Sequence, residues 1–216
     1  MAKIALFGAN GTIGRRVLAE ALARGHQVTA VVRDPAALDL SHPELTKVTG
    51  DVLDAESVRA AARGQDVVVS AVGGGDGPGH QKLIPSAARV LVEGLRGLGD
   101  QAPRLIAVGG AGSLETASGV KVWDAPGLPE WLLQIMHAHG DALDFLRGVQ
   151  DVRWTSLSPA ATIEPGERTG AYRTGTEQLV TDAEGNSYIT AEDYAVALVD
   201  EIEHPRHIGE RFTVAR

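Results

Sequence analysis

The sequence predicts an α/β fold with a doubly wound parallel sheet, formed by one domain that spans residues 1–216. Two patterns predict it: short, continuously apolar segments recur along the chain, and segments with helical spacing separate them. Continuous apolar runs are typical of strands that are buried on both faces, and alternation with helices is typical of successive βαβ units. A chain of 216 residues, 44% of them hydrophobic, is also long enough to bury one sizeable core.

Each element is predicted from its apolar pattern and from the residues that flank it. The first strand stops at Gly8, and the helix after it places apolar residues on one side before it ends at Gly25. The predicted strands cover residues 4–7, 28–32, 45–48, 67–69, 105–108, 152–157 and 212–214. The predicted helices cover residues 12–24, 55–62, 81–98, 130–147 and 191–203.

Two segments depart from this alternation. Residues 109–129 join a strand to a helix without a strong period, and connections of that length are usually functional, so we expect a lid. Residues 159–190 are expected to form a small C-terminal subregion on the substrate side, with a hairpin that pairs residues 178–181 with 187–189. Thr190 and Asp193 then resemble the two ends of a capping box, with Asp193 in place of the usual glutamate.

The composition excludes several classes of function. The net charge of −8 argues against a general binder of nucleic acid or of anionic membranes, which would need a basic surface. The chain contains no cysteine, so it can form neither a disulfide, nor a zinc-thiolate site, nor a thiolate nucleophile. We see no signal peptide, no apolar run of about 18 residues and no cluster of metal ligands. We therefore expect a cytoplasmic protein without a metal site.

Three glycines, Gly8, Gly11 and Gly14, form a G-x-x-G-x-x-G loop directly between the first predicted strand and the first predicted helix. Gly8 lets the strand turn sharply, Gly11 removes a side chain where a pyrophosphate would approach, and Gly14 lets the helix pack closely on the sheet. The first N–H groups of the helix would face the anion. The loop predicts a dinucleotide-binding Rossmann fold, and a glycine-rich turn without a ligand is the alternative.

Several segments together point to a known family. They are residues 3–14 (KIALFGANGTIG), 30–35 (AVVRDP), 50–54 (GDVLD), 107–114 (AVGGAGSL) and 157–160 (LSPA). With these segments the chain resembles the atypical short-chain dehydrogenase/reductases, and among them the NADH-flavin reductase group that is related to biliverdin reductase B. The resemblance covers nearly the whole chain. It is specific for fold and cofactor and uninformative about the substrate.

The resemblance implies a role for each matching position in binding a nicotinamide dinucleotide. The loop from Gly8 through Asn10 to Gly14 would hold the pyrophosphate, with backbone N–H groups from Thr12 and Ile13. The expected neighbours are Asp51 and Val52 for the adenine, Ala71, Val72 and Gly73 for the nicotinamide ribose, and Ser158, Pro159 and Ala160 for the nicotinamide ring. The alternatives are a turn residue for Asp51 and a strand-end hydroxyl for Ser158.

Arginines near the end of the second strand favour NADP(H) over NAD(H). A site for NAD usually places an acidic residue there to bind the ribose 2′-hydroxyl, whereas this chain has Arg33 first and Asp34 second. A guanidinium can bind a 2′-phosphate with paired donors, and Arg15 and Arg16 add positive charge nearby. The alternatives are a surface pair of Arg33 with Asp34, and an Asp34 that serves NAD.

The catalytic pattern of the superfamily is missing. The common members place Tyr-x-x-x-Lys on the helix after the fifth strand, but here the lysine position falls on His139 and the tyrosine position on Ile135. His139 lies on the inward, apolar stripe of its helix, and Gly140 beside it would allow a close approach. We expect His139 to act as a polar group near the nicotinamide ribose or on a substrate proton, with a core histidine as the alternative.

Two further polar residues lie near the expected site. Ser113 falls close to the position of the superfamily serine, although that position could instead be Gly110. His80 follows a glycine-rich segment, residues 73–79, which we expect to be a mobile loop that could close on the cofactor.

These features predict an NAD(P)H-dependent oxidoreductase that reduces a flavin, such as FMN or riboflavin, or another flat conjugated acceptor. Hydride transfer between two flat rings does not require a tyrosine acid, because the cofactor carries the chemistry and the protein orients the rings. The alternative is a non-catalytic NADP(H)-sensing regulator on the same scaffold, which would also lack the tyrosine and lysine. Aromatic residues make up only 4% of the chain, so an aromatic flavin site is not evident. The oligomeric state stays open.

Overall fold

An eight-stranded sheet forms the centre of the molecule, in the order β3-β2-β1-β4-β5-β6-β10-β8. The computed structural model describes all residues, from Met1 to Arg216. Every neighbouring pair of strands is parallel except β10 and β8. The strands are β1 Lys3–Phe7, β2 Gln27–Val32, β3 Leu45–Thr49, β4 Val67–Ser70, β5 Arg104–Val108, β6 Trp154–Ser158, β8 Arg173–Gly175 and β10 Glu210–Ala215. The strand order reverses between β1 and β4, so a crevice is expected where these two strands end.

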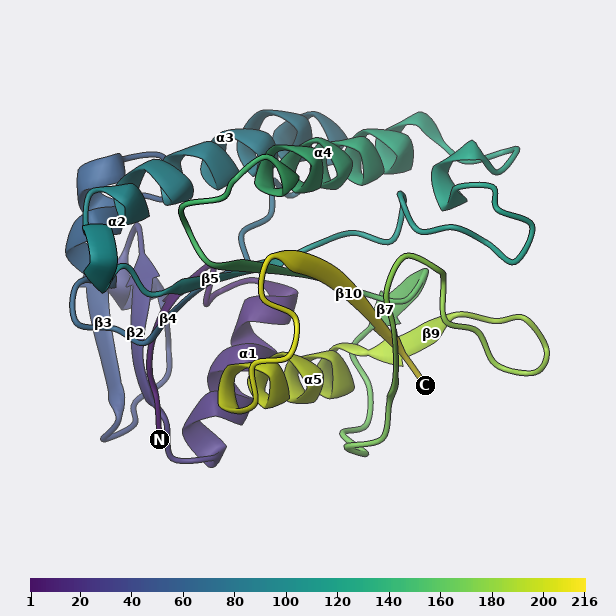
Figure 1. Cartoon of the computed structure of the whole chain (residues 1–216). Helices are drawn as coiled ribbons and strands as arrows, with labels where there is room; N and C mark the ends of the chain where they lie inside the picture. Colours follow the sequence, from purple (N-terminus) through teal and green to yellow (C-terminus); the bar gives the residue numbers. More distant parts are fainter.

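Helices cover both faces of the sheet. Figure 1 shows α2, α3 and α4 on the upper face and α1 with α5 on the lower face. The helices are α1 Thr12–Ala23, α2 Ala55–Ala62, α3 Gly77–Arg96, α4 Glu130–Arg147 and α5 Ala191–Glu203. Three single 3₁₀ turns are η1 Pro35–Ala37, η2 Gly99–Gln101 and η3 Val122–Asp124. The prediction of a doubly wound parallel sheet is therefore confirmed. None of the helices combines the length and the apolar composition needed to cross a membrane.

The apolar core has two layers, one on each face of the sheet. Leu18 and Tyr194 are fully buried in the layer under α1 and α5, and Leu91 and Leu146 in the layer under α3 and α4. Burial of each such side chain stabilises the fold by about 1.5–3 kcal/mol before the entropy of ordering is counted. Tyr194 also donates its hydroxyl to the carbonyl of Leu157 at 2.6 Å, so its polar atom is satisfied inside the core.

The predicted hairpin in the C-terminal subregion is wrong. The turn over residues 182–186 exists, since the N–H of Asp182 donates to the carbonyl of Asn186 at 2.9 Å. Its arms, however, pair elsewhere: β9 (Tyr188–Thr190) pairs in parallel with β7 (Thr162–Glu164), and the 177–179 backbone pairs with Glu115. The backbone groups of both arms form hydrogen bonds with segments that are distant in the chain. No local sequence pattern indicates such distant partners.

The long connection between β5 and α4 is held in place by backbone hydrogen bonds of its own. The N–H of Val122 donates to Leu114 at 3.0 Å, and the N–H of Thr116 to Val120 at 2.8 Å. Leu114 is fully buried. The segment is thus folded back on itself around a buried leucine, which differs from the open lid that its length suggested.

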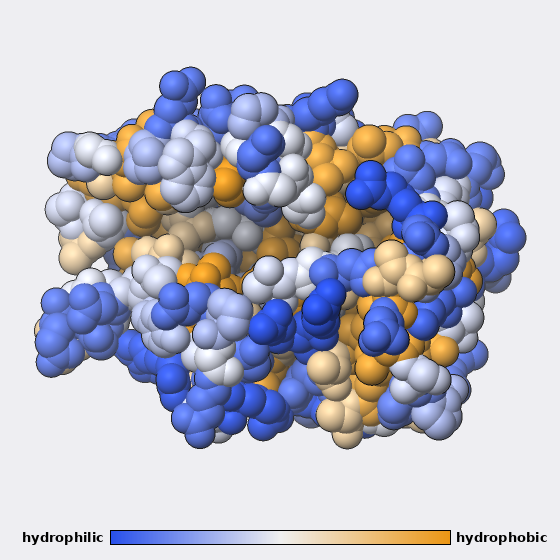
Figure 2. Space-filling view, turned by 180° about the vertical axis from the view of Figure 1, so that it is seen from behind, coloured by the Kyte–Doolittle hydropathy of each residue, from blue (hydrophilic) through white to orange (hydrophobic).

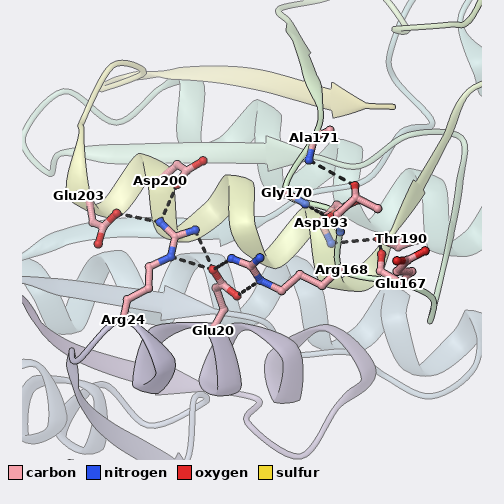
Figure 3. Close-up of polar contacts among 11 residues, drawn as sticks. Glu20, Arg24, Glu167, Arg168, Gly170, Ala171, Thr190, Asp193, Asp200 and Glu203 are labelled. Atoms are coloured by element: carbon pink, nitrogen blue, oxygen red, sulfur yellow. Dashed lines mark hydrogen bonds and ion pairs between the residues drawn. The ribbon is translucent and has the colours of Figure 1, made fainter.

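A polar network fastens the C-terminal subregion to α1 and α5 (Figure 3). Glu20 accepts hydrogen bonds from Arg24 and Arg168, and Arg24 also pairs with Asp200 and Glu203. Nearby, the Thr190 hydroxyl accepts from the N–H of Asp193 at 3.0 Å, as a helix cap. The Asp193 carboxylate does not close the predicted capping box. It accepts instead from the backbone N–H groups of Thr169 and Gly170 at 2.7 and 2.8 Å.

A buried ion pair joins β5 to the end of α5. The Arg104 guanidinium donates to Glu201 at 2.7 Å, and the two side chains are only 5% and 3% exposed. Glu201 accepts further hydrogen bonds from the N–H groups of Arg206 and His207 and contacts the His207 ring at 2.8 Å. Burial alone would raise the pKa of Glu201, but these donors, the His207 ring foremost, lower it below its ordinary value.

Replacing Glu201 with alanine should destabilise the fold by about 3–5 kcal/mol, because Arg104 would stay buried without its partner. Urea unfolding at neutral pH measures the change, and Arg96→Ala, which breaks the exposed pair with Asp151, is the matched control with little expected effect. Since the folded-state pKa of Glu201 is lowered, its contribution is present at neutral pH and is lost as the pH falls below about 4.3. Equal stability of Glu201→Ala and Arg96→Ala would contradict this account.

Candidate cofactor site

The phosphate loop is shaped by two glycines that touch backbone. Gly8 has a φ of +86°, and a Cβ at this position would lie 2.4 Å from the carbonyl oxygen of Ala71 at the end of β4. A Cβ at Gly14 would lie 2.0 Å from the carbonyl oxygen of Gly8. Both distances are shorter than any carbon–oxygen contact, so only glycine lets the loop, the helix and β4 approach one another this closely.

Gly11 differs from these two, because a side chain there would meet the neighbouring backbone less closely. A Cβ there would meet only the carbonyl oxygens of Gly8 at 3.3 Å and Ala71 at 3.8 Å. Gly11 is also the N-cap of α1, where no side chain caps the helix and no acidic residue occupies the first turn. The first N–H groups of α1, including those of Thr12 and Ile13, are therefore left free for an anion. This arrangement fits the pyrophosphate of a dinucleotide.

A cleft of about 790 Å³ opens at the ends of β1, β2, β3 and β4, where the strand order reverses. Nine of the predicted cofactor residues line it: Gly8, Asn10, Gly11, Arg33, Asp51, Val52, Ala71, Val72 and Gly73. Seen from behind, the molecule is hollowed between the layer with α3 and α4 and the part with α1 and α5, and apolar and neutral residues gather in the hollow (Figure 2). The cleft is large enough for a dinucleotide cofactor.

The arginines near the phosphate loop differ in whether they form an ion pair. Arg33 lines the cleft, is exposed and forms no ion pair, since the Asp34 carboxylate instead accepts from the N–H of Ala36 at 3.0 Å. Arg15 is exposed and donates only to the carbonyl of Asn10 at 3.4 Å. Arg16 is engaged with Glu192 at 2.9 Å. The surface pair of Arg33 with Asp34 is therefore absent, and the two free guanidiniums are those of Arg33 and Arg15.

Asp51 combines a structural contact with a place in the cleft. One carboxylate oxygen accepts from the N–H of Leu53 at 2.9 Å, as in a turn, and the residue still lines the cleft. Ala71, Val72 and Gly73 follow β4 directly and line the cleft beside the phosphate loop. In contrast, Ser158, Pro159 and Ala160 at the end of β6 are buried and lie outside the lining of this cleft. Their assignment to the nicotinamide ring stays a prediction.

His139 is partly buried on α4 and lies against the backbone after β5. A Cβ at Gly110 would lie 2.8 Å from the Cβ of His139, so Gly110 is the residue that makes room for this side chain. Burial, and then the neighbouring His80, lower the pKa of His139 to about 4, against a hydrogen bond with the Val108 backbone that raises it. His139 is therefore neutral near pH 7, and it cannot serve there as a charged acid.

His80 was not among the predicted site residues, yet it lies beside both His139 and the cleft. The two imidazole centroids are 6.0 Å apart. Asp76 caps α3 by accepting from the N–H of Gly79 at 2.6 Å, so residues 77–79 already form the first helical turn. The expected mobile loop over residues 73–79 is thus a compact turn, and α3 begins four residues earlier than predicted. The position of His80 directly after the glycine run was the available signal.

Gly140 makes room for a protein side chain. A Cβ there would lie 2.7 Å from the Trp123 indole, and a Cβ at Gly112 would lie 3.0 Å from the same ring. Trp123 thus anchors the 109–129 connection against α4. The sequence suggested that Gly140 allows a close approach, and in the structure the group that approaches it is this indole.

Ser113 belongs to a different polar cluster. Its hydroxyl accepts a hydrogen bond from Arg211 at 2.6 Å, and the buried Arg211 side chain also pairs with Glu177. Glu177 in turn pairs with Arg147 at the end of α4. Ser113 does not line the cleft. These contacts join the 109–129 connection to the C-terminal subregion, and a catalytic role for Ser113 stays a prediction.

Comparison with known proteins places the chain in a family. A family model described as NAD(P)H-binding matches residues 8–205. The chain belongs to this NAD(P)H-binding family. The match begins at Gly8, the first glycine of the phosphate loop, and runs through α5. The resemblance to the atypical short-chain dehydrogenase/reductases and the expectation of a nicotinamide cofactor are thereby confirmed.

Three solved structures are similar to this family member over nearly their whole length. A "putative exported protein" of Burkholderia pseudomallei is 46% identical, with a TM-score of 0.88 and 100% coverage of both chains. A "putative epimerase" of Bacteroides thetaiotaomicron is 39% identical, with a TM-score of 0.90 and coverage of 99% and 96%. A "putative NADH-flavin reductase" of Streptococcus pneumoniae is 32% identical, with a TM-score of 0.87 and 100% coverage of both chains. The three names agree on no single reaction.

Gly11→Val should abolish dinucleotide binding while the protein stays folded. The backbone at Gly11 has φ −74° and ψ 169°, which valine adopts readily, but the isopropyl group would fill the space for the pyrophosphate. Titration of NADPH fluorescence beside a thermal melt measures both effects. Gly14→Ala is the contrasting variant, because its methyl group would collide with Gly8 and lower the melting temperature. Normal NADPH binding by folded Gly11→Val would mean that the loop is only a turn.

Proposed function

We propose that this protein is an NADPH-dependent reductase of a flat, conjugated acceptor, with FMN or riboflavin as the first candidates. The observation that carries the proposal is the cleft that would hold the dinucleotide. Arg33 lines it without an ion pair, and the helix position of the superfamily's catalytic tyrosine is occupied by Ile135. The Streptococcus pneumoniae protein named a "putative NADH-flavin reductase" supports reduction of a flavin, since this chain is 32% identical to it over its whole length.

The preference for NADPH rests on Arg33. Its guanidinium lines the cleft without an ion pair, so binding a 2′-phosphate would not first require breaking one. Asp34, the residue that could accept a ribose 2′-hydroxyl for NAD, uses a carboxylate oxygen to cap η1 at the N–H of Ala36. Arg15 adds a second free positive charge at the start of α1.

The choice of acceptor rests on what the site lacks. Ile135 occupies the helix position where the superfamily's tyrosine would protonate a carbonyl or deprotonate an alcohol. His139 is neutral near pH 7, since burial and His80 lower its pKa to about 4. Acceptors that take a hydride on a conjugated ring and a proton from water need neither group. An epimerase, the name carried by the Bacteroides structure, usually needs such an acid and base.

The roles of the chain's own residues follow from this. The free N–H groups at the start of α1 would bind the pyrophosphate, and Arg33 would bind the 2′-phosphate. Ala71, Val72 and Gly73 would orient the nicotinamide half along the cleft. A bound NADPH would supply the hydride. The apolar hollow seen in Figure 2 would exclude water from the ring of the acceptor.

Arg33→Ala should weaken NADPH binding by about tenfold to a hundredfold and leave NADH binding nearly unchanged. The reason is the loss of a charge-assisted contact of roughly 1.5–3 kcal/mol with the 2′-phosphate. Calorimetric titration of both cofactors measures the effect. Arg63→Ala, an exposed arginine without an ion pair outside the cleft, is the matched control. Equal affinities of the unaltered protein for NADPH and NADH would rule out the assigned role of Arg33.

The protein should oxidise NADPH steadily when FMN or riboflavin is added, and much more slowly without an acceptor. The nicotinamide absorbance under anaerobic conditions measures the rate, and folded Gly11→Val provides the background. Tight NADPH binding without turnover on any conjugated acceptor would favour the NADP(H)-sensing regulator instead.

A further inference from the structure

The ring of His80 is fixed in one tautomer by the backbone of its own helix. Its Nδ1 lies 2.7 Å from the carbonyl oxygen of Asp76. A carbonyl oxygen can only accept, so Nδ1 carries the hydrogen and donates it. In the neutral ring, Nε2 is then left with a lone pair and can only accept a hydrogen bond.

The free Nε2 of His80 lies next to Gly73, a residue that lines the cofactor cleft. It is 3.3 Å from the place that a Cβ on Gly73 would take, and Gly73 lines the cleft. Glycine at position 73 therefore leaves the acceptor nitrogen uncovered on that side. Gly74 and Gly79 also line the cleft, and their backbones are in close contact. A Cβ at Gly79 would lie 2.2 Å from the carbonyl oxygen of Gly74.

His139 is the neighbouring polar ring, and it has the same hydrogen-bonding character. The Val108 backbone beside it raises its pKa, as a carbonyl that accepts from the ring does. One nitrogen of a neutral imidazole can only accept. The centroids of the two imidazoles are 6.0 Å apart.

We propose that His80 is a cofactor-binding residue whose Nε2 accepts a hydrogen bond from a hydroxyl of the nicotinamide ribose, with His139 as a second acceptor beside it. The inference rests on the dinucleotide site of the proposed function and not on the identity of the electron acceptor. It accounts for three glycines at once: Gly73 uncovers the nitrogen, while Gly74 and Gly79 allow the turn that holds His80 in place.

The proposal also explains why a histidine can replace the superfamily's lysine. A lysine would donate hydrogen bonds to the ribose hydroxyls, whereas two neutral imidazoles would accept hydrogen bonds from them. A hydroxyl group can both donate and accept, so either arrangement can hold the ribose. The pair then positions the nicotinamide without supplying a proton. For His139 this is the first of the two roles that the sequence predicted, near the nicotinamide ribose, and not the role on a substrate proton.

The test compares two ligands that share the adenine half. NADPH carries the nicotinamide ribose, and 2′,5′-ADP lacks it. His80→Ala should weaken NADPH binding by about threefold to tenfold, the effect of one neutral hydrogen bond, and leave 2′,5′-ADP binding unchanged. His80→Gln, which places an amide oxygen near the position of Nε2, should recover most of the NADPH affinity. His204→Ala, an exposed histidine on α5's end, should change neither ligand.

A double variant tests whether the two rings act on the same group. NADPH affinity in His80→Ala/His139→Ala should differ from the sum of the single effects, because both rings would hold one ribose. An equal loss of NADPH and 2′,5′-ADP affinity in His80→Ala would overturn the proposal, since it would mean that the turn, and not the contact, was changed. Unchanged NADPH affinity would overturn it as well. A selective loss without flavin reduction would support the inference and contradict only the proposed acceptor.

Discussion

The close approach of three backbone segments at the strand-order reversal is the constraint on which the rest of the structure depends. Gly8, Gly14 and the end of β4 at Ala71 come so near that any Cβ would collide with a carbonyl oxygen. This contact sets the direction in which α1 leaves the sheet and so aims its free N–H groups into the cleft. The position of Gly73, and through it of His80, follows from the same end of β4.

Three glycines after β5 and on α4 make room for protein side chains. Gly110 admits His139, Gly112 admits Met136 and Trp123, and Gly140 admits Trp123. These contacts fix the 109–129 connection and α4 relative to β5. Ser113, in the same connection, belongs to the Arg211–Glu177 cluster. Interiors packed at this density leave few alternatives for where a ring can lie.

The positive charge available at the cleft depends on which arginines form ion pairs, more than on which arginines lie near the phosphate loop. Arg15, Arg16 and Arg33 all belong to the region around the phosphate loop, yet Arg16 is held by Glu192 from α5. Asp34 caps η1, and Arg33 stays exposed in the lining of the cleft without an ion pair. In the α1–α5 network of Figure 3, Glu20 likewise binds Arg24 and Arg168, so these two arginines are paired outside the cleft.

The sequence by itself determined seven of the eight strands of the sheet, the five helices and the phosphate loop, because apolar periodicity and glycine spacing act over a few residues at a time; it did not predict β8. It predicted α2 and α4 to the residue, and nine of the predicted cofactor positions line the cleft. Only the tertiary structure decided that Gly140 faces Trp123, that β9 pairs with β7, and that His80 stands beside His139. Each of those contacts joins segments distant in the chain, and a glycine or a histidine has the same local pattern whichever partner it meets.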